Sequence, residues 1–222
     1  MESRPYHHYL FFCVEKSFYS LSSDEQKRIS TSFVELIAAQ PMLVEVYGTR
    51  AFKAGTTFML WSRGTRPEDA QDLLRVVEHS ALGAYLSLTY TYFGIVKPSV
   101  YSGRVGKPEQ VMQNYEERLP YLVIYPFSKT HDWYQLTDEE RKSIMGEHIK
   151  TGIGHGAVRQ CLLYAYGIDD YEFLVSYEMN TLEEFQQVIV DMRKTKGRPY
   201  TLIDTPIFTC RHLPLTDLPA WL

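Results

Sequence analysis

One histidine lies where an amphipathic helix would place it on its inward face. Arg141, Ile144, Met145 and His148 recur at i, i+3, i+4 and i+7, which is the spacing of one helical face. A neutral imidazole in such a place can bind a transition metal or haem iron. An inward histidine is, however, more often a hydrogen-bonded core residue. The spacing marks His148 as a candidate ligand and leaves the core interpretation open.

Three further side chains could act on an anion or take part in redox chemistry. Tyr125 and Lys129 stand at the end of an apolar, strand-like run, and Arg193 closes a helical pattern. A strand-end Lys is commonly just solvated, and a cation at a helix C-terminus is favourable by itself, by about 0.3–1 kcal/mol. The functional alternative for Arg193 is a clamp for a carboxylate or a phosphate.

The composition and the absent motifs exclude several classes of chemistry. The chain has 222 residues, with 23 basic against 27 acidic side chains, so nucleic acid and anionic membrane are not predicted partners. Three cysteines without a CxxC pair exclude a disulfide framework and disfavour structural zinc. Motifs for phosphate loops, zinc proteases and serine or cysteine nucleophiles are absent. The glycine-rich residues 152–156 follow a helix rather than open one.

No segment predicts export or membrane insertion. The first residues lack the apolar run of a signal peptide. The longest uncharged stretch, residues 80–96, is rich in Ser, Thr and Tyr and shorter than the roughly 20 apolar residues of a membrane span. A soluble cytoplasmic protein is therefore predicted.

Tyrosine is unusually frequent, with 17 residues against 11 Phe and 3 Trp. Tyrosine is favoured in strands and keeps a polar end when buried. The excess indicates either a β-rich core or a redox-active, ligand-binding interior. Tyr90, Tyr92, Tyr171 and Tyr177 fall in strand patterns and are predicted to pack.

Helical and strand-like hydrophobic patterns alternate along the first half of the chain. Ser22 and Glu25 have the spacing of a capping box before a helical pattern that Pro41 ends. A second helix has Pro67 in its first turn and ends at Gly83. The predicted strands are residues 6–15, 42–47, 56–61 and 86–96. The order is β-α-β-β-α-β.

The second half repeats this order after a linker rich in Pro and Gly. Residues 133–144 resemble residues 18–29, and both contain aromatic-Tyr-x-Leu, a hydroxyl N-cap and a Glu three residues later. The predicted strands are residues 121–125, 158–166, 171–178 and 201–210, with helices that open at Thr137 and Thr181. A repeat of about 115 residues is too long for a solenoid.

We therefore predict the α+β fold class, with duplicated ferredoxin-like β-α-β-β-α-β halves forming one dimeric α+β barrel domain. The predicted halves are residues 1–97 and 121–222, joined by a linker over 98–120. The second half carries the candidate site.

The second half resembles the chlorite dismutase-like haem proteins, especially the coproheme decarboxylase branch. The resemblance covers roughly residues 6–212 in layout and is strongest over 119–193. The motifs are, in order, Tyr125-Pro126-x-Ser128-Lys129, Trp133-Tyr134-x-Leu136, Glu139-Glu140-Arg141, Glu147-His148, Gln160, Gly167-x-Asp169-Asp170-Tyr171-Glu172 and Met192-Arg193. Members of this family are duplicated ferredoxin-like barrels, pentameric in the long-chain branch. The resemblance implies a homo-oligomer, specifically a pentamer.

The resemblance also implies a role for each candidate residue. His148 corresponds to the proximal axial ligand of haem iron, and Gln160 to the distal glutamine of the decarboxylase branch. Tyr125 corresponds to the tyrosine that becomes a radical and oxidises a propionate, with Lys129 as its partner and Arg193 as a propionate anchor. The implied reaction is the oxidative decarboxylation of coproheme III to haem b, with hydrogen peroxide as the co-substrate.

The sequence departs from the family at three points. The family's spacing between the proximal His and the distal Gln is one residue longer, so the strand register favours Gln160 and the spacing favours Cys161. No arginine aligns with a propionate-binding arginine upstream of Tyr125, so either Arg118 or Arg104 substitutes for it or the anchor is missing. Arg198 replaces a hydroxyl that follows the last helix.

These departures keep rival functions open. A haem-binding or peroxidase-like protein could use the same scaffold with incomplete anchors. A non-haem α+β barrel could simply bury His148. Chlorite dismutation ranks last, because no distal arginine aligns.

Overall fold

The computed structural model describes residues 4–98, 112 and 116–222, so most of the predicted linker lies outside the described residues. The chain divides into two compact units. Unit 1 comprises Met1–Ile95 and Cys210–Leu222, and unit 2 comprises Val96–Thr209. The C-terminal segment therefore groups with the N-terminal half of the chain.

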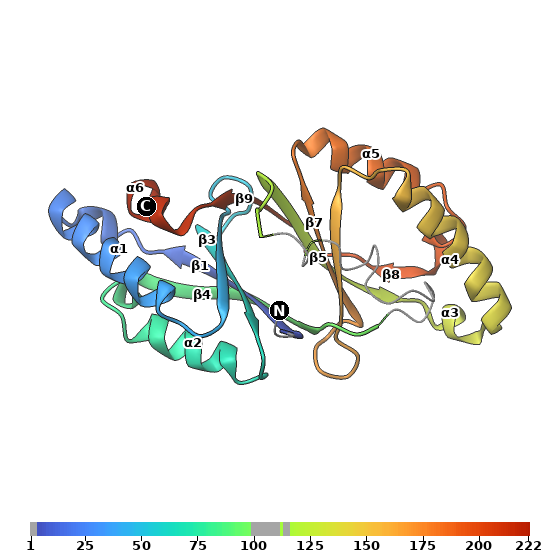
Figure 1. Ribbon diagram of the computed structural model, residues 1–222, viewed down its shortest axis with the longest axis horizontal. Helices are drawn as coiled ribbons and strands as arrows, with labels where there is room; N and C mark the ends of the chain where they lie inside the picture. Colours follow the sequence, from blue (N-terminus) through green and yellow to red (C-terminus); the bar gives the residue numbers. More distant parts are fainter. Residues whose placement is uncertain (1–3, 99–111, 113–115) are drawn as a thin grey trace. The chain divides into compact units, whose positions relative to one another are not determined.

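Unit 1 is an antiparallel sheet with helices on one face (Figure 1). Its elements are β1 (Tyr6–Val14), α1 (Ser23–Ala38), β2 (Leu43–Gly48), β3 (Phe58–Gly64), α2 (Asp69–Glu78), β4 (Leu86–Ile95), β9 (Phe208–Leu213) and α6 (Leu218–Trp221). The strand order is β4-β1-β3-β2-β9. The first four of these strands have the order of a ferredoxin-like sheet.

The helix-covered face of unit 1 is a filled apolar core. Helix α1 begins at the predicted capping box, in which Ser22 and Glu25 bond each other's backbone N–H groups. Its inward face then buries Ile29, Phe33 and Ile37. These side chains pack with strand residues of alternating position, including Leu10, Phe12, Val14, Val46, Phe58 and Leu60.

The other face of the unit 1 sheet is a layer of buried aromatic residues. Tyr9, Tyr47 and Tyr92 are fully buried, and Tyr9 stacks on Trp61 with ring centroids 5.5 Å apart. Tyr92 packs with Phe11 edge to face at 5.9 Å. Much of the tyrosine excess is thus used for packing, and Tyr90, although 39% exposed, packs against Tyr92 with ring centroids 5.0 Å apart.

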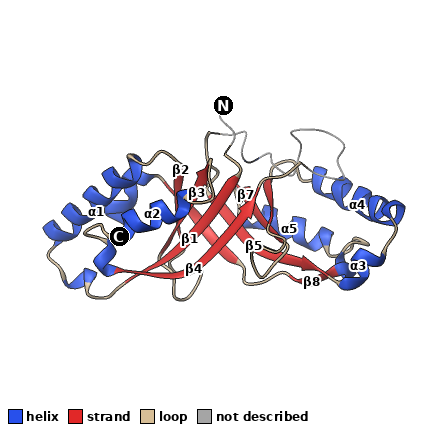
Figure 2. Ribbon diagram, turned by 90° about the horizontal axis from the view of Figure 1, so that it is seen from below, coloured by secondary structure: helices blue, strands red, loops and turns tan. Residues whose placement is uncertain are grey.

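Unit 2 repeats the same plan, again with its helices on one side of its own strands (Figure 2). Its elements are β5 (Tyr121–Lys129), α3 (His131–Gln135), α4 (Asp138–Ile153), β6 (Arg159–Tyr164), β7 (Phe173–Met179), α5 (Leu182–Met192) and β8 (Thr201–Ile203). The strand order is β6-β7-β5-β8. The α+β fold class with duplicated ferredoxin-like halves is confirmed in both units.

The last predicted strand, residues 201–210, is wrong as a single element. It divides into β8, which pairs with β5 in unit 2, and β9, which pairs with β2 in unit 1. Pro206 lies between them and has no N–H group to continue a ladder. Short 3-10 turns precede β4 and β8 at Gly83–Tyr85 and Arg198–Tyr200.

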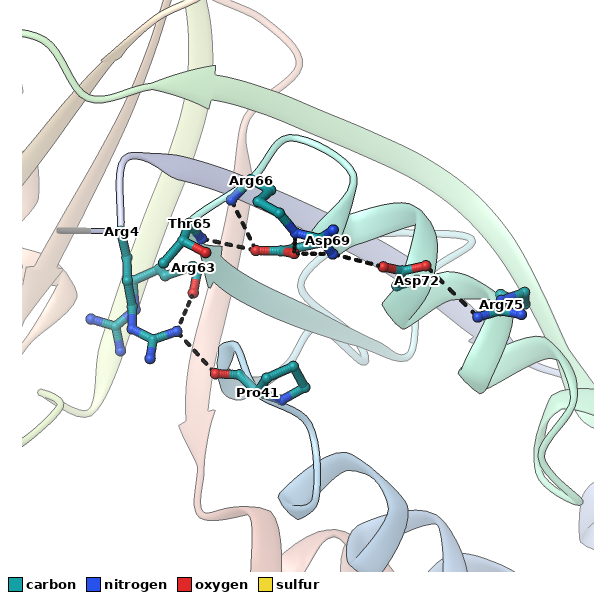
Figure 3. Close-up of polar contacts among 8 residues, drawn as sticks. All are labelled: Arg4, Pro41, Arg63, Thr65, Arg66, Asp69, Asp72 and Arg75. Atoms are coloured by element: carbon teal, nitrogen blue, oxygen red, sulfur yellow. Dashed lines mark hydrogen bonds and ion pairs between the residues drawn. The ribbon is translucent and has the colours of Figure 1, made fainter. Parts of the chain in front are cut away.

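A buried carboxylate organises the turn from β3 into α2 (Figure 3). Asp69 Oδ2 accepts from the N–H groups of Thr65 at 2.8 Å and Arg66 at 3.0 Å, and Arg66 Nε donates to Oδ1 at 3.0 Å. Burial raises the pKa of Asp69, but the hydrogen bonds from Arg66 and Thr65 outweigh it, so the pKa of this carboxyl lies below its usual value. Gly64 makes room for the carboxylate, because a Cβ there would meet the Asp69 side chain.

Among the described helices, none combines the length and the apolar composition needed to cross a bilayer.

A fully buried histidine makes the stability of unit 1 depend on pH. His7 packs against Trp61, with ring centroids 5.6 Å apart. Burial first, and then the charge of Arg63, lower the pKa of His7 to about 3. In the unfolded chain the imidazole returns to its ordinary pKa of 6.5. Between these two values the unfolded state binds the proton and the folded state does not.

We expect the free energy of unfolding to fall as the pH drops from 6.5 towards 4, by about 1.4 kcal/mol per pH unit from His7 at the acid end. Urea unfolding followed by tryptophan fluorescence at several pH values measures this slope. The His7→Gln variant should flatten it. The matched change His79→Gln, at the exposed end of α2, should leave it unchanged. An unaltered slope in His7→Gln contradicts the assignment.

Candidate functional site

The sheet register of unit 2 places three polar side chains on one face, two of them predicted site residues. Tyr125 pairs with Val175, and Tyr177 lies two residues further along β7. Gln160 pairs directly with Tyr177. Directly opposed residues point to the same side of a sheet, so Tyr125, Tyr177 and Gln160 share a face. Cys161 pairs with Ser176 on the opposite face and is fully buried, so the register favours Gln160 over Cys161 for this face.

Tyr125 and Tyr177 form a stacked phenol pair on this face. Their ring centroids are 6.1 Å apart and the ring planes differ by 26°. Burial, followed by the neighbouring phenol of Tyr177, raises the pKa of Tyr125 well above its usual value. Burial also raises the pKa of Tyr177 to about 12. Both phenols are therefore protonated at neutral pH, and loss of an electron from either must be accompanied by loss of its proton.

Lys129 ends β5 in an aromatic and charged setting. Its Nζ lies over the Trp133 ring, 4.6 Å from the centroid, and its backbone N–H donates to Glu172 Oε2 at 2.8 Å. Burial lowers the pKa of Lys129 to about 8, against the opposing effect of Glu172 and with a further lowering from Arg198. Lys129 is thus mainly cationic at neutral pH and close enough to its pKa to exchange a proton.

His148 lies on a helix whose inward face is only half-buried. No side chain of α4 is fully buried, and Ile144, Met145 and His148 are partly exposed, whereas α1, its counterpart in unit 1, buries Ile29, Ser30, Phe33 and Ile37. Burial of the imidazole, and then the charge of Lys129, lower the pKa of His148 to about 4. The imidazole is therefore neutral at physiological pH, which is the form that binds a metal.

Polar contacts hold α4 in place instead of a core stripe. The helix begins at a capping box between Thr137 and Glu140. Further along, Glu147 Oε2 accepts from the Lys196 N–H at 3.1 Å, and His155 Nε2 lies 3.3 Å from Asp191 Oδ2 of α5. These contacts fix α4 beside α5 (Figure 1).

Arg193 is the C-cap of α5, and its side chain is 54% exposed. Its Nη2 lies 3.8 Å from Asp204 Oδ2, and Arg198 Nη1 lies 2.7 Å from the same oxygen. Asp204 and Arg193 both act electrostatically on Tyr125, with opposite signs. The predicted anchor thus belongs to a three-residue charge cluster beside the tyrosine.

The structure brings four of the five predicted site residues into electrostatic contact. Lys129 acts on His148, and Arg193 acts on Tyr125. Arg198 joins the two pairs, because it acts on Lys129 and shares Asp204 with Arg193. Gln160 connects to this group through Tyr177, its cross-strand partner.

The sequence did not single out Asp204 or Glu172 as participants. Asp204 is the one charged residue among positions 201–210, a stretch predicted to be a strand. An isolated carboxylate in such a run was a usable signal. Tyr177 was predicted to pack, and it does, but its partner is Tyr125.

Arg118 does not substitute for the missing anchor. Its Nη1 lies 3.5 Å from Glu178 Oε1, and both side chains are buried, 1% and 0% exposed. Glu178 pairs with Leu122 and so points to the sheet face opposite Tyr125. Arg104, the other candidate, lies outside the described residues.

Within the described residues, no three His, Cys, Asp or Glu side chains converge as a metal site would require.

Comparison with known proteins gives these residues a context. The family profile described as chlorite dismutase matches residues 23–213. A coproheme decarboxylase from Mycolicibacterium smegmatis is 27% identical over 176 residues, which is 79% of this chain and 75% of the relative. Both findings agree with the resemblance seen in the motifs.

Solved structures match the fold over almost the whole chain. A chlorite dismutase from Candidatus Nitrospira defluvii, solved in complex with imidazole, superimposes with a TM-score of 0.88 at 21% identity, covering 99% of this chain and 95% of that one. An arginine-to-lysine mutant of that protein gives the same values. At this identity the match demonstrates the fold alone.

The burial of Arg118 predicts a structural role that can be measured. We expect Arg118→Leu to lower the free energy of unfolding by about 3–5 kcal/mol, because it leaves Glu178 buried without its close partner. The double variant Arg118→Leu/Glu178→Leu should recover most of that loss in urea unfolding. Arg159→Leu, which removes a more exposed arginine 4.0 Å from Glu178, is the matched control and should cost less. Little change in stability together with weakened ligand binding would instead make Arg118 an anchor.

Proposed function

The chain belongs to the chlorite dismutase family, and from that premise we propose that it is a haem-dependent oxidoreductase that decarboxylates coproheme III to haem b with hydrogen peroxide. The observation that carries the proposal is that Tyr125 and Gln160 share one face of the unit 2 sheet, with Lys129 in electrostatic range of a neutral His148 and the Arg193–Asp204 pair in range of Tyr125. The coproheme decarboxylase among the relatives supports the choice of substrate.

The residues present fit a porphyrin that carries several carboxylates. One neutral imidazole suffices as the protein ligand of a haem iron, because the porphyrin supplies the equatorial donors. The inward side of α4 carries Ile144, Met145 and His148, all partly exposed. The sheet presents partly buried aromatic side chains at Tyr125, Phe127 and others. Apolar and aromatic side chains of this kind suit a flat porphyrin.

The reaction balances as an exchange of two electrons for each propionate. Loss of CO₂ from a propionate leaves a vinyl group, one proton and two electrons. Those electrons, with protons, reduce one hydrogen peroxide to two waters, and the sequence occurs twice for coproheme III. Bound haem with peroxide supplies the oxidant for this exchange.

The side chain positioned to pass single electrons is Tyr125. Its phenol is protonated and mostly buried, so each oxidation must release both an electron and a proton. The phenol of Tyr177 stacks beside Tyr125 on the same face and can hydrogen-bond the Tyr125 oxygen before and after it loses its proton. Lys129, with a pKa of about 8, can hold a carboxylate as a cation or accept a proton as an amine.

The remaining roles are binding and orientation. Arg193 presents a half-exposed guanidinium for a carboxylate. Gln160 supplies a neutral amide that can hydrogen-bond peroxide without adding charge. Assembly as a homopentamer is part of the same proposal.

The role of His148 predicts a spectroscopic result. Purified protein titrated with coproheme should show a shifted Soret band, and His148→Ala should lose that shift and bind about tenfold to 100-fold more weakly, because the axial ligand is gone. His131→Ala, at the exposed start of α3, is the control and should behave like the wild type. Failure of the wild-type protein to bind either coproheme or haem b refutes every haem-dependent function.

The role of Tyr125 predicts a separation of binding from turnover. With coproheme and peroxide, mass spectrometry should show two successive losses of CO₂ from the wild-type protein's substrate. Tyr125→Phe should slow these losses at least about 100-fold while the Soret titration stays the same, because only the oxidisable hydroxyl is removed. Tyr121→Phe, on the same strand and the same face, should not change the rate. Undiminished turnover in Tyr125→Phe removes that residue from the mechanism. Binding without CO₂ loss in the wild type favours a peroxidase-like function instead.

A further inference from the structure

Asp204 is a carboxylate shared by two arginines at the predicted propionate anchor. Its Oδ2 lies 2.7 Å from Arg198 Nη1 and 3.8 Å from Arg193 Nη2. The Asp204 side chain is only 26% exposed, and those of Arg198 and Arg193 are 34% and 54% exposed. Both pairs are therefore accessible to a ligand and partly shielded from water, which strengthens them relative to fully exposed pairs.

The cluster lies at the reactive end of the proposed site. Asp204 and Arg193 act on the charge state of Tyr125, and Arg198 acts on that of Lys129. Three cations meet two carboxylates here, since Lys129, Arg193 and Arg198 face Asp204 and Glu172. Asp204 and Glu172 thus neutralise most of the positive charge that would otherwise attract a ligand carboxylate.

A ligand carboxylate and Asp204 must compete for the same guanidinium donors. Arg193 is the predicted anchor, and Asp204 already accepts a hydrogen bond from Arg198 and forms a longer ion pair with Arg193. A propionate can bind Arg193 only if the ion pair between Arg193 and Asp204 weakens. When that propionate leaves as CO₂, the guanidinium groups are again without a carboxylate from the ligand, and Asp204 is beside them.

We propose that Asp204 acts as an exchangeable counter-ion for Arg193 and Arg198, which yields them to a substrate carboxylate and takes them back once that carboxylate is lost. The inference rests on the proposed function. It makes Asp204 a positioning residue that limits how tightly the carboxylate-rich substrate binds and keeps the arginines paired in the product complex. Arg198, which replaces a hydroxyl residue in the family comparison, is the second arginine that exchanges its carboxylate partner.

The test compares coproheme, which has four carboxylates, with haem b, which has two, by Soret titration of the full-length protein. In Asp204→Asn the competitor is removed, so coproheme should bind about tenfold more tightly, the effect of one charge-assisted hydrogen bond. Haem b should change by no more than about twofold, because it brings no carboxylate to this subsite. Asp204→Glu, which keeps the counter-ion, should restore wild-type discrimination.

Glu183→Gln is the matched control for net charge. Glu183 is an exposed carboxylate in the first turn of α5, outside the Arg193–Asp204–Arg198 cluster. Equal tightening of both porphyrins, equal effects of Glu183→Gln and Asp204→Asn, or an unchanged coproheme affinity overturns the inference and leaves the proposed function intact. Failure of wild-type protein to bind either porphyrin overturns both. Arg198→Gln provides a second measurement if Asp204→Asn is unstable, and it should weaken coproheme binding more than haem b binding.

Discussion

Unit 2 depends on a helix, α4, that keeps its position without fully burying a single side chain. A buried Phe or Ile contributes roughly 1.5–3 kcal/mol, and α1 gains several such terms while the half-buried side chains of α4 contribute less. Contacts at the helix ends and along α5, such as Glu147 with the Lys196 N–H, also hold α4. The duplicated fold thus has a filled core stripe on one helix and a half-packed face on its counterpart, and the candidate ligand His148 lies on the half-packed face.

Electrostatics in unit 2 is divided between the two faces of its sheet. Arg118 and Glu178 neutralise each other where neither side chain meets solvent. On the other face, the charges around Lys129 and Arg193 remain partly exposed and incompletely balanced. A buried pair is costly to break and so stabilises a structure, whereas a partly exposed cluster can change partners. The two faces therefore differ: one holds a buried ion pair, and the other holds a cluster whose ions can exchange partners.

Local signals were enough to predict the helices and the duplication. The capping boxes at Ser22, Thr137 and Thr181 are set by residues three positions apart, and all three are present. The motif resemblance predicted the family, which the profile match confirms. The burial of Arg118 could not be predicted locally, because its partner Glu178 lies 60 residues further along the chain. The pairing of Asp204 with Arg198 is local, but it was hidden because positions 201–210 were predicted to be one strand. The division of β8 from β9 was not predicted, because most residues at positions 201–210 favour a strand and Pro206 was the only sign of an interruption. The roles of His148, Gln160 and the other site residues stay predictions.

The pairing of β9 with β2 has a consequence for how the chain is made. Unit 2 is inserted between Ile95 and Cys210 of unit 1. During synthesis, the edge of β2 stays open until Arg211–Leu213 have left the ribosome, after all of unit 2. An unpaired edge strand is a site for mispairing with another chain. Residues 1–95 must therefore wait as an incomplete sheet, and rapid folding of the inserted unit, which brings its two ends into reach, shortens that period of exposure.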